Sequence, residues 1–408
     1  MEAILTGNIN TPGVDDIAVY RDRGGYQALR KALAMEQDDI LGEIKLSRLY
    51  GRSGAFPVYN KWSMARQQTS DTKYLVCNAD EGEPGCFKDK LILGRDPHLV
   101  IESMVIAGYT IGADKGYIYI RGEYNGEAGI FNKALEQAKQ KGYLGDNILG
   151  SDFSFDIQIY RGAGSYVVGE ETALLRSMSG YRPFPGPRPP YPVEKGFLGK
   201  PTVVNNVETL INVPFIVAKG GKWYRGIGHP EYPGTKLFCL SGNVNRPGVY
   251  ELPIGVTLRE LISNYGQGVN GDLKAILPGG VASGLVNDLN IRMDYKSLAD
   301  VNSLLGPGAV IVINRENSVI DIALNTLEFF ARESCGKCSV CREGLRAGLM
   351  MMRRFAEGEG RQDDIRLLRI LRRLMYYTAN CVLGQAALNV TVSATRLFRK
   401  EFEARVRG

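Results

Sequence analysis

Four cysteines near the C-terminal end constrain this chain more than any other feature. Cys335, Cys338 and Cys341 stand three residues apart in ESCGKCSVCREG, and Cys381 follows in TANCVLG. Three thiolates at this spacing converge on three corners of an iron–sulfur cubane, and a fourth from a distant segment completes its ligation. The pattern therefore predicts a [4Fe–4S] cluster and, with it, the transfer of electrons.

Zinc is the alternative occupant of such a cysteine set. Structural zinc sites more often use two C-x₂-C pairs, or cysteine together with histidine. The only histidines, His98 and His229, lie far from the cysteine run in sequence. The spacing therefore favours an iron–sulfur cluster over zinc.

The other three cysteines, Cys77, Cys86 and Cys239, show no regular spacing. An odd remainder of this kind is not a disulfide framework, and it indicates a reducing, cytoplasmic environment. We expect these thiols to be small buried side chains.

Length and composition indicate an ordinary globular protein of two or three domains. The chain has 408 residues, of which 44% are hydrophobic and 23% charged, and a single core rarely serves so many. No stretch approaches the roughly 20 apolar residues of a membrane span. The start, MEAILTGNIN, has no basic segment followed by an apolar one, so we expect no export signal.

The net charge is +6, and arginines gather in RLLRILRRL and RLFRKEFEARVRG. One interpretation is an anionic partner such as nucleic acid or a membrane surface. The other is the solvated face of amphipathic helices, or a docking face for an acidic subunit. We favour the second, because no nucleic-acid motif accompanies the arginines.

The pattern of the chain predicts an α/β protein with four parts. Residues 1–48 are helical, and residues 49–234 alternate strands and helices, with strands expected at KYLVCNAD, GYIYIRGEY and FDIQIYRG. This alternation predicts a mostly parallel sheet with ligand loops at the strand ends. Residues 235–315 contain a hairpin around NRPG, one short helix and a last strand, and suggest a β-grasp domain. Residues 316–408 form a helical bundle that carries the cysteines.

Four polar, glycine-bearing segments at strand or helix ends could hold a nucleotide. GRSGAFPVYNKW, residues 51–62, offers backbone N–H groups together with the positive charge of Arg52 and Lys61. CNADEGEPGCFKD, residues 77–89, places Asp80, Glu81 and Glu83 after an apolar strand, which favours contact with ribose hydroxyls or a metal over a solvated loop.

The other two segments are RGAGSYVVGEETALL, which leads through Gly169, Glu170 and Glu171 into a helix, and PTVVNNVETL. In the latter, Asn205 and Asn206 supply amide groups at a helix start. The proline-rich loop 179–192 is expected to be the wall of a ligand site.

These motifs together resemble, in order, the NADH-binding FMN/[4Fe–4S] flavoprotein subunits. That family includes the 51 kDa-like subunit of respiratory complex I and the diaphorase subunits of NAD-linked hydrogenases, formate dehydrogenases and electron-bifurcating oxidoreductases. The resemblance runs from about Gly51 to the C-terminus. It implies a Rossmann-like domain for FMN and NAD(H), a ubiquitin-like β-grasp domain and a helical bundle with one [4Fe–4S] cluster.

The resemblance also implies a set of binding residues. The flavin is expected against Gly51, Arg52, Gly54, Lys61, Asn78, Asp80, Tyr166, Gly169, Glu170, Asn205 and Asn206. For the dinucleotide, Phe56 resembles the aromatic that stacks on it, Glu83 the carboxylate that binds the adenosine ribose, and Glu171 the acid near the nicotinamide. A carboxylate at Glu83 would repel a 2′-phosphate, so NAD is expected over NADP. The cluster takes Cys335, Cys338, Cys341 and Cys381.

The chain departs from the family pattern at several positions. GRSGAFP is one residue shorter than the usual GRGGAGFP, and Met64 stands where an aromatic is usual. Arg188 and Tyr191, near the adenine or phosphates, replace a lysine and a phenylalanine. Because arginine and lysine differ in geometry, these changes bear on the details of NAD binding.

The activity implied is that of an NADH:acceptor oxidoreductase. Hydride passes between NAD(H) and flavin N5, and electrons then pass singly to the cluster; no catalytic nucleophile or general acid is expected. Expected partners are a thioredoxin-like [2Fe–2S] subunit and a larger iron–sulfur or catalytic subunit, such as a hydrogenase or formate dehydrogenase. No nucleic acid and no membrane span are expected.

The departures from the family motifs favour a soluble, cytoplasmic complex over complex I. Electron-bifurcating complexes are among the soluble ones. Two other interpretations stay open at this point. One is a flavin-free electron-relay or scaffold subunit of the same kind of complex, and the other is a nucleic-acid-binding iron–sulfur protein.

Overall fold

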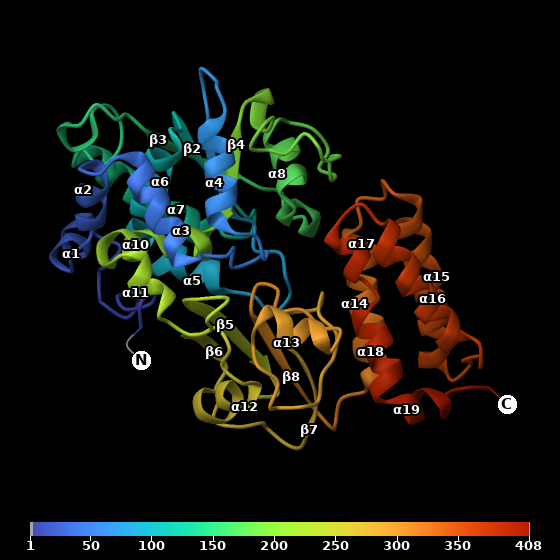
Figure 1. Ribbon diagram of the computed structural model, residues 1–408. Coiled ribbons are helices and arrows are strands. Elements are labelled where there is room, and N and C mark those ends of the chain that lie inside the picture. Colours follow the sequence, from blue (N-terminus) through green and yellow to red (C-terminus); the bar gives the residue numbers. More distant parts are fainter. Residues whose placement is uncertain (1–2, 408) are drawn as a thin grey trace.

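The computed structural model describes residues 3–407. Two four-stranded sheets and a group of C-terminal helices follow one another along the chain, and the helices stand at one side of the molecule (Figure 1). Among the described residues, no helix is both long and apolar enough to cross a membrane.

The first sheet is parallel, with strand order β3-β2-β1-β4. Its strands are β1 (Tyr74–Ala79), β2 (Lys115–Ile120), β3 (Asp156–Arg161) and β4 (Thr202–Asn206). The prediction of the first three strands is confirmed. The fourth was not predicted. Asn205 and Asn206 end this strand, and Asn206 caps the helix that follows, so they stand at a helix start as expected. The strand is only five residues long, and two of them are asparagine, so its apolar signal is weak.

Helices cover both faces of this sheet, as expected of a Rossmann-like arrangement (Figure 1). They are α5 (Lys88–Arg95), α6 (Pro97–Ile111), α7 (Asn125–Gln140), α8 (Glu171–Met178), α9 (Val207–Leu210), α10 (Val213–Lys219) and α11 (Gly221–Arg225). Nearly every residue of α6 is buried, because it is apolar on all sides.

The N-terminal helices pack into the core of the first sheet. They are α1 (Ile17–Asp22), α2 (Gln27–Leu33), α3 (Gln37–Ser47) and α4 (Val58–Gln67). The buried Glu102 of α6 binds the first two of these helices: its carboxylate accepts hydrogen bonds from Tyr20 Oη at 2.6 Å, from Tyr26 N at 2.9 Å and from Leu29 N at 3.0 Å. The segment before residue 49 therefore shares one hydrophobic core with the sheet.

The second sheet is mixed, with order β6-β5-β8-β7. It contains β5 (Thr235–Gly242), β6 (Gly248–Pro253), β7 (Leu273–Leu277) and β8 (Ala309–Asn314), with the short helices α12 (Leu258–Glu260) and α13 (Tyr295–Asp300). The predicted hairpin is β5–β6, and the predicted last strand is β8, which pairs in parallel with β5. We did not predict β7, because LKAIL is short and is followed at once by PGG.

The C-terminal part is helical, as predicted. Its helices are α14 (Val319–Glu333), α15 (Ser339–Glu357), α16 (Asp364–Thr378), α17 (Val382–Ala386), α18 (Asn389–Leu397) and α19 (Arg399–Glu403). Their apolar faces share one core with α8, with the face of the first sheet that carries Val76 and Val204, and with β7 and β8 of the second sheet.

Candidate functional site

The strand order of the first sheet reverses between β1 and β4, and ligands of such sheets bind in the crevice beyond that point. Asn78 near the end of β1 donates from Nδ2 to Gly169 O at 3.1 Å. Asn206 at the end of β4 donates from Nδ2 to Asn78 O at 3.2 Å. Three of the four predicted loops therefore meet at this crevice.

Several charged side chains line one side of the crevice. Lys61 Nζ lies 2.7 Å from Glu171 Oε2 and donates to Val204 O at 3.0 Å. Arg188 Nη2 lies 3.2 Å from Glu171 Oε1 and also contacts Glu170. The structure thus brings together four predicted binding residues from α4, α8 and the proline-rich loop.

The Gly51 turn requires glycine at its first position. A Cβ on Gly51 would lie 2.2 Å from Gly54 O, and Gly51 N donates to Phe56 O at 2.9 Å. Phe56 itself is 48% exposed, so its ring is free to stack on a ligand. Trp62 holds Asn205 from behind, through a 2.8 Å hydrogen bond from Nε1 to Oδ1.

Arg52 does not offer its charge to a ligand, contrary to our expectation. The side chain is fully buried and donates from Nη2 to Tyr224 Oη at 2.5 Å and to Pro233 O at 2.7 Å. The turn points this side chain inward, where it ties the first sheet to the segment that precedes β5.

Asp80 is a buried carboxylate with an unused oxygen. Among the described residues, no donor reaches its Oδ2. Burial raises the pKa of Asp80 to about 7, and the nearby Glu123 and Glu333 add to this while Arg121 opposes it. An orphaned acceptor at the crevice is what a ligand hydroxyl or N–H would satisfy, so the residues present fit a flavin mononucleotide.

This pKa predicts a pH dependence for the flavin-free protein. The folded pKa of about 7 exceeds the unfolded value, so folding takes up protons between roughly pH 4 and pH 7. The stabilisation from protonated Asp80 is present below that window and is lost as the pH rises through 7. We expect the melting temperature of the wild type, relative to Asp80→Asn, to fall by on the order of 5 °C between pH 5 and pH 8. Melting temperatures that change with pH by the same amount in the two proteins would contradict this prediction.

Glu83 lies where the first sheet meets the β-grasp part. Its Oε2 accepts from Tyr166 Oη at 2.6 Å, and its Oε1 accepts from Ala282 N at 3.0 Å. Burial raises the pKa of Glu83 to about 7, which these hydrogen bonds oppose. A ribose hydroxyl could replace the tyrosine as the donor to this carboxylate.

Tyr166 connects the crevice to the segment that holds the cysteines. Its backbone N donates to Glu333 Oε2 at 2.8 Å, and its ring packs edge-on against Phe329 and Phe330 of α14. Glu333 was not predicted as a site residue. It stands two positions before the predicted ligand Cys335, and this closeness was the only signal for it in the sequence.

The proline-rich loop 179–192 lies against the cysteine loop. Arg182 donates to Cys335 O at 3.1 Å, and Lys337 donates to Pro185 O at 3.2 Å. Phe184 sits between the Arg176 guanidinium, 3.8 Å from its ring centroid, and the Lys337 amine at 4.2 Å. Tyr191 is exposed at the far end of the loop.

The four cysteines come from two helix starts. Cys335 and Cys338 precede α15, Cys341 lies in its first turn, and Cys381 precedes α17. Burial raises the pKa of Cys341 to about 11, and the other three thiols add to this shift, so all four are neighbours. A Cβ on Gly384 would lie 2.7 Å from Ala379 Cβ and 3.2 Å from Cys341 Sγ, so this position beside the thiol favours glycine.

Within residues 3–407, no three Cys, His, Asp or Glu side chains are close enough to hold a single metal ion. A zinc ion needs its sulfur ligands about 2.3 Å from one centre. A cubane instead spreads its four thiolates over four iron atoms. Three thiolates from one loop and helix start, with a fourth from the start of α17, are the Cys₄ set that a cubane uses, so the donor set fits an iron–sulfur cluster.

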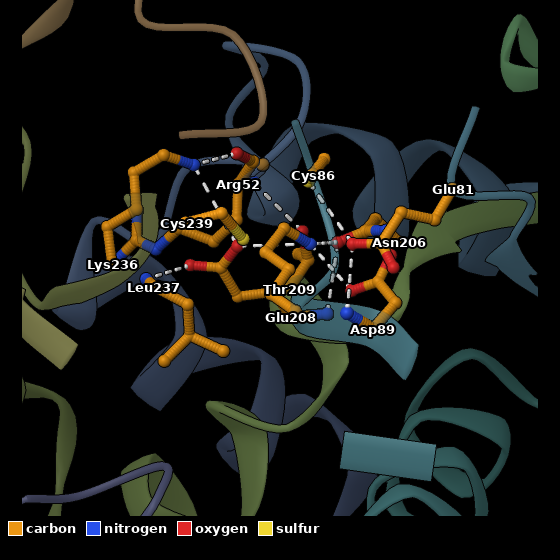
Figure 2. A network of polar contacts seen from close by, with 12 residues as sticks. Arg52, Glu81, Cys86, Asp89, Asn206, Glu208, Thr209, Lys236, Leu237 and Cys239 are labelled. Carbon is orange, nitrogen blue, oxygen red and sulfur yellow. Dashed lines mark hydrogen bonds and ion pairs between the residues drawn. The ribbon is translucent and has the colours of Figure 1, made fainter. Parts of the chain in front are cut away.

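A buried ionic network beneath the crevice was missed by sequence reasoning (Figure 2). Lys88 is fully buried, with Nζ 2.6 Å from Asp89 Oδ1, 3.2 Å from Glu208 Oε2 and 3.0 Å from Asn206 Oδ1. Lys236 of β5 contacts Glu208 at 3.8 Å and donates to the backbone carbonyl of Arg52. Burial lowers the pKa of Lys236 to about 8. No local sequence pattern marks these residues, because their partners are far apart along the chain.

Two buried cysteines adjoin this network, as expected for small buried side chains. Cys86 Sγ lies 3.1 Å from Glu81 Oε1, and Phe87 N donates to Cys239 Sγ of β5 at 3.3 Å. Glu81 also accepts from Tyr124 Oη at 2.9 Å. Through these hydrogen bonds, Glu81 stabilises the loop that follows β1.

Three family models match successive parts of the chain. The Nuo51 FMN-binding domain matches residues 44–215, the SLBB domain residues 236–313, and the NADH-ubiquinone oxidoreductase-F iron–sulfur binding region residues 321–405. They follow one another in the order of the first sheet, the second sheet and the C-terminal helices.

Similar proteins span nearly the whole chain. An NADH-quinone oxidoreductase subunit of Rhizobium meliloti is 44% identical, over 99% of this chain and 98% of that protein. The NADP-reducing hydrogenase subunit HndC of Solidesulfovibrio fructosivorans is 42% identical, over 98% of this chain and 82% of that protein. A crystal structure of an NAD⁺-reducing [NiFe]-hydrogenase in the H₂-reduced state superposes with a TM-score of 0.86 at 33% identity, covering 99% of this chain and 67% of the other.

These matches establish the cofactors as FMN and one [4Fe–4S] cluster, with NADH binding in the family. The chain belongs to the family of NAD-dependent FMN/[4Fe–4S] flavoprotein subunits, which includes its relatives from the NADH-quinone oxidoreductases.

Proposed function

We propose that this chain binds NADH against FMN in the β1–β4 crevice and delivers the electrons to partner subunits through the cluster at α15 and α17. When bound, FMN accepts a hydride and releases electrons singly, which is the chemistry that a one-electron cluster requires. The observation that carries the proposal is the direct link through Tyr166, which donates from its hydroxyl to Glu83 at 2.6 Å and from its backbone to Glu333 at 2.8 Å.

The residues of the crevice bind and orient the cofactor. The Gly51 turn and the start of α8 would border the bound flavin, and Lys61 would supply the nearby positive charge. We assign to the flavin Gly51, Arg52, Gly54, Lys61, Asn78, Asp80, Tyr166, Gly169, Glu170, Asn205 and Asn206. The assignment of Arg52 rests on the resemblance alone, because its side chain donates to Tyr224, its backbone N–H donates to Thr209 Oγ1 and its carbonyl accepts from Lys236.

The dinucleotide would be held between the Gly51 turn and the proline-rich loop. Phe56 would stack on it, Glu83 would accept from the adenosine ribose, Glu171 would face the nicotinamide, and Arg188 and Tyr191 would border the adenine and phosphates. In this structure Arg188 is paired with Glu170 and Glu171. A phosphate would compete with these carboxylates for the guanidinium.

The partners we propose are a thioredoxin-like [2Fe–2S] subunit and a larger iron–sulfur or catalytic subunit, in a cytoplasmic complex. Relatives are subunits of NADH-quinone oxidoreductases and of hydrogenases, which supports this. The four parts would be residues 1–48, 49–234, 235–315 and 316–408. In support, the SLBB match, 236–313, and the iron–sulfur match, 321–405, fall within the last two parts, and the FMN-binding match, 44–215, overlaps most of the second.

Bound flavin is the first test. Protein purified with its partners should release about one FMN per chain on denaturation, seen in the flavin absorbance bands. If iron is present but flavin is absent, the chain is a flavin-free relay or scaffold and the proposal fails.

Glu83→Gln should raise the use of NADPH relative to NADH by about tenfold, because the carboxylate that repels a 2′-phosphate is gone. The measurement is the ratio of kcat/KM for the two nucleotides with ferricyanide as acceptor. Glu136→Gln, on the exposed face of α7, is the matched control. An unchanged ratio in Glu83→Gln would contradict the ribose assignment.

A further inference from the structure

Helix α16 carries an exposed apolar stripe. Leu367, Ile370, Leu374 and Tyr377 are 41%, 51%, 50% and 73% exposed. Their spacing of three, four and three residues places them on one face of the helix. Single exposed leucines are ordinary, but four in line on one helix are typical of an interaction surface. We call these four residues the α16 stripe.

The stripe is not the face by which α16 joins its own bundle. Leu368 and Met375 are buried on the other side. There Gly344 and Gly348 of α15 let Leu371 and Met375 approach closely, since a Cβ on Gly344 would lie 2.6 Å from Met375 Sδ. The helix is therefore held independently of whatever covers the stripe.

The stripe leads to the cluster. Tyr377 stands four residues before Cys381, and Val382 immediately after that ligand is 58% exposed. A protein covering the stripe would thus lie beside the cluster, where electrons can leave the chain.

Arginines run along one edge of the stripe. Arg366, Arg369 and Arg373 are exposed, and at 100° per residue they lie next to the apolar face. Arg366 pairs with the exposed Asp363, at 3.3 Å. Within residues 3–407, Arg369 and Arg373 form no ion pair. An apolar centre with a cationic rim fits a partner that presents an apolar patch edged by carboxylates.

We propose that the α16 stripe is the docking site of the iron–sulfur protein that takes electrons from this chain, and that this partner carries an acidic rim. The inference rests on the proposed function, because it names the surface by which the cluster's electrons leave. Arginine supplies planar, always charged donors for carboxylates, and the apolar stripe excludes water between the two proteins.

The test uses the whole complex, purified anaerobically through a tag on this chain. The variant Ile370→Asp/Leu374→Asp places two carboxylates in the stripe, where they oppose both its apolar character and an acidic partner. The matched control is Leu304→Asp, an exposed leucine of the β-grasp part. The readouts are FMN and iron per chain, NADH:ferricyanide activity, the subunits that co-purify, and the NADH-driven reduction of their iron–sulfur centres by EPR.

In the stripe variant, we expect FMN, iron and ferricyanide activity within about twofold of the wild type. We expect at least a roughly tenfold loss of the co-purifying iron–sulfur subunit and of its reduction by NADH. The Leu304→Asp control should retain the co-purifying iron–sulfur subunit and its reduction by NADH. Raised salt should weaken the association of the wild-type chain with this subunit. A stripe variant that keeps its iron–sulfur partner and the wild-type reduction rate would overturn the proposal.

Two other outcomes would overturn it as well. One is a stripe variant that loses only self-association, which would make the face a contact between two copies. The other is a stripe variant that loses only nucleic-acid binding. Failure of the proposed function looks different, because the wild type itself would then lack flavin or ferricyanide activity.

Discussion

Replacing Cys381 with serine is expected to abolish the reduction of partner iron–sulfur centres by NADH. Cys381 is the one ligand that comes from outside the Cys335–Cys341 run, so its loss leaves an incomplete site at the start of α17. NADH:ferricyanide activity should survive, because the β1–β4 crevice does not include this residue. The measurements are iron content, the EPR signal of the reduced cluster and the two activities.

Cys86→Ser is the matched control for that substitution. Cys86 is buried beside Glu81 and belongs to no ligand set, so its serine variant should keep full iron and both activities. A Cys381→Ser protein with wild-type iron and an unchanged cluster signal would refute the ligand assignment.

Replacing Lys88 with methionine is expected to lower the free energy of unfolding by about 3–5 kcal/mol, the usual cost of leaving a buried charge without its partner. The substitution removes the cation that lies 2.6 Å from Asp89 and 3.2 Å from Glu208, and it strips a hydrogen bond from Asn206. Urea denaturation measures the effect, and FMN affinity should fall with it, because Asn206 borders the crevice.

Two variants make the result specific to the buried network. Lys90→Met removes a half-exposed lysine 3.8 Å from Glu127 and should change stability by less than about 0.5 kcal/mol. Lys88→Met combined with Glu208→Gln should recover part of the loss. Equal unfolding curves for Lys88→Met and Lys90→Met would show that the network does not stabilise the fold.

The sequence predicts those parts of the protein whose signal is local. The first three strands, the β5–β6 hairpin and the C-terminal helices follow from apolar periodicity and from turn residues, and the structure confirms them. The cluster ligands follow from cysteine spacing, and the family matches confirm an iron–sulfur region there. The sequence did not predict strands β4 and β7, because a run of five residues shows too little apolar periodicity.

What the sequence could not predict depends on contacts between distant segments. Lys88, Glu208 and Lys236 look like surface residues in the sequence, and only folding brings them together out of water. The direction of Arg52 likewise depends on Tyr224, 172 residues away. The resemblance supplied the set of crevice residues, and the structure adds Glu333, which acts through a backbone contact that no motif encodes.

Anaerobic titration of the purified protein with NADH tests the central claim most directly, with flavin followed by absorbance and the cluster by EPR. The account predicts about one FMN and about four iron atoms per chain, with both centres reduced by NADH. Zinc in place of iron, or a cluster that NADH cannot reduce while flavin is present, would contradict it.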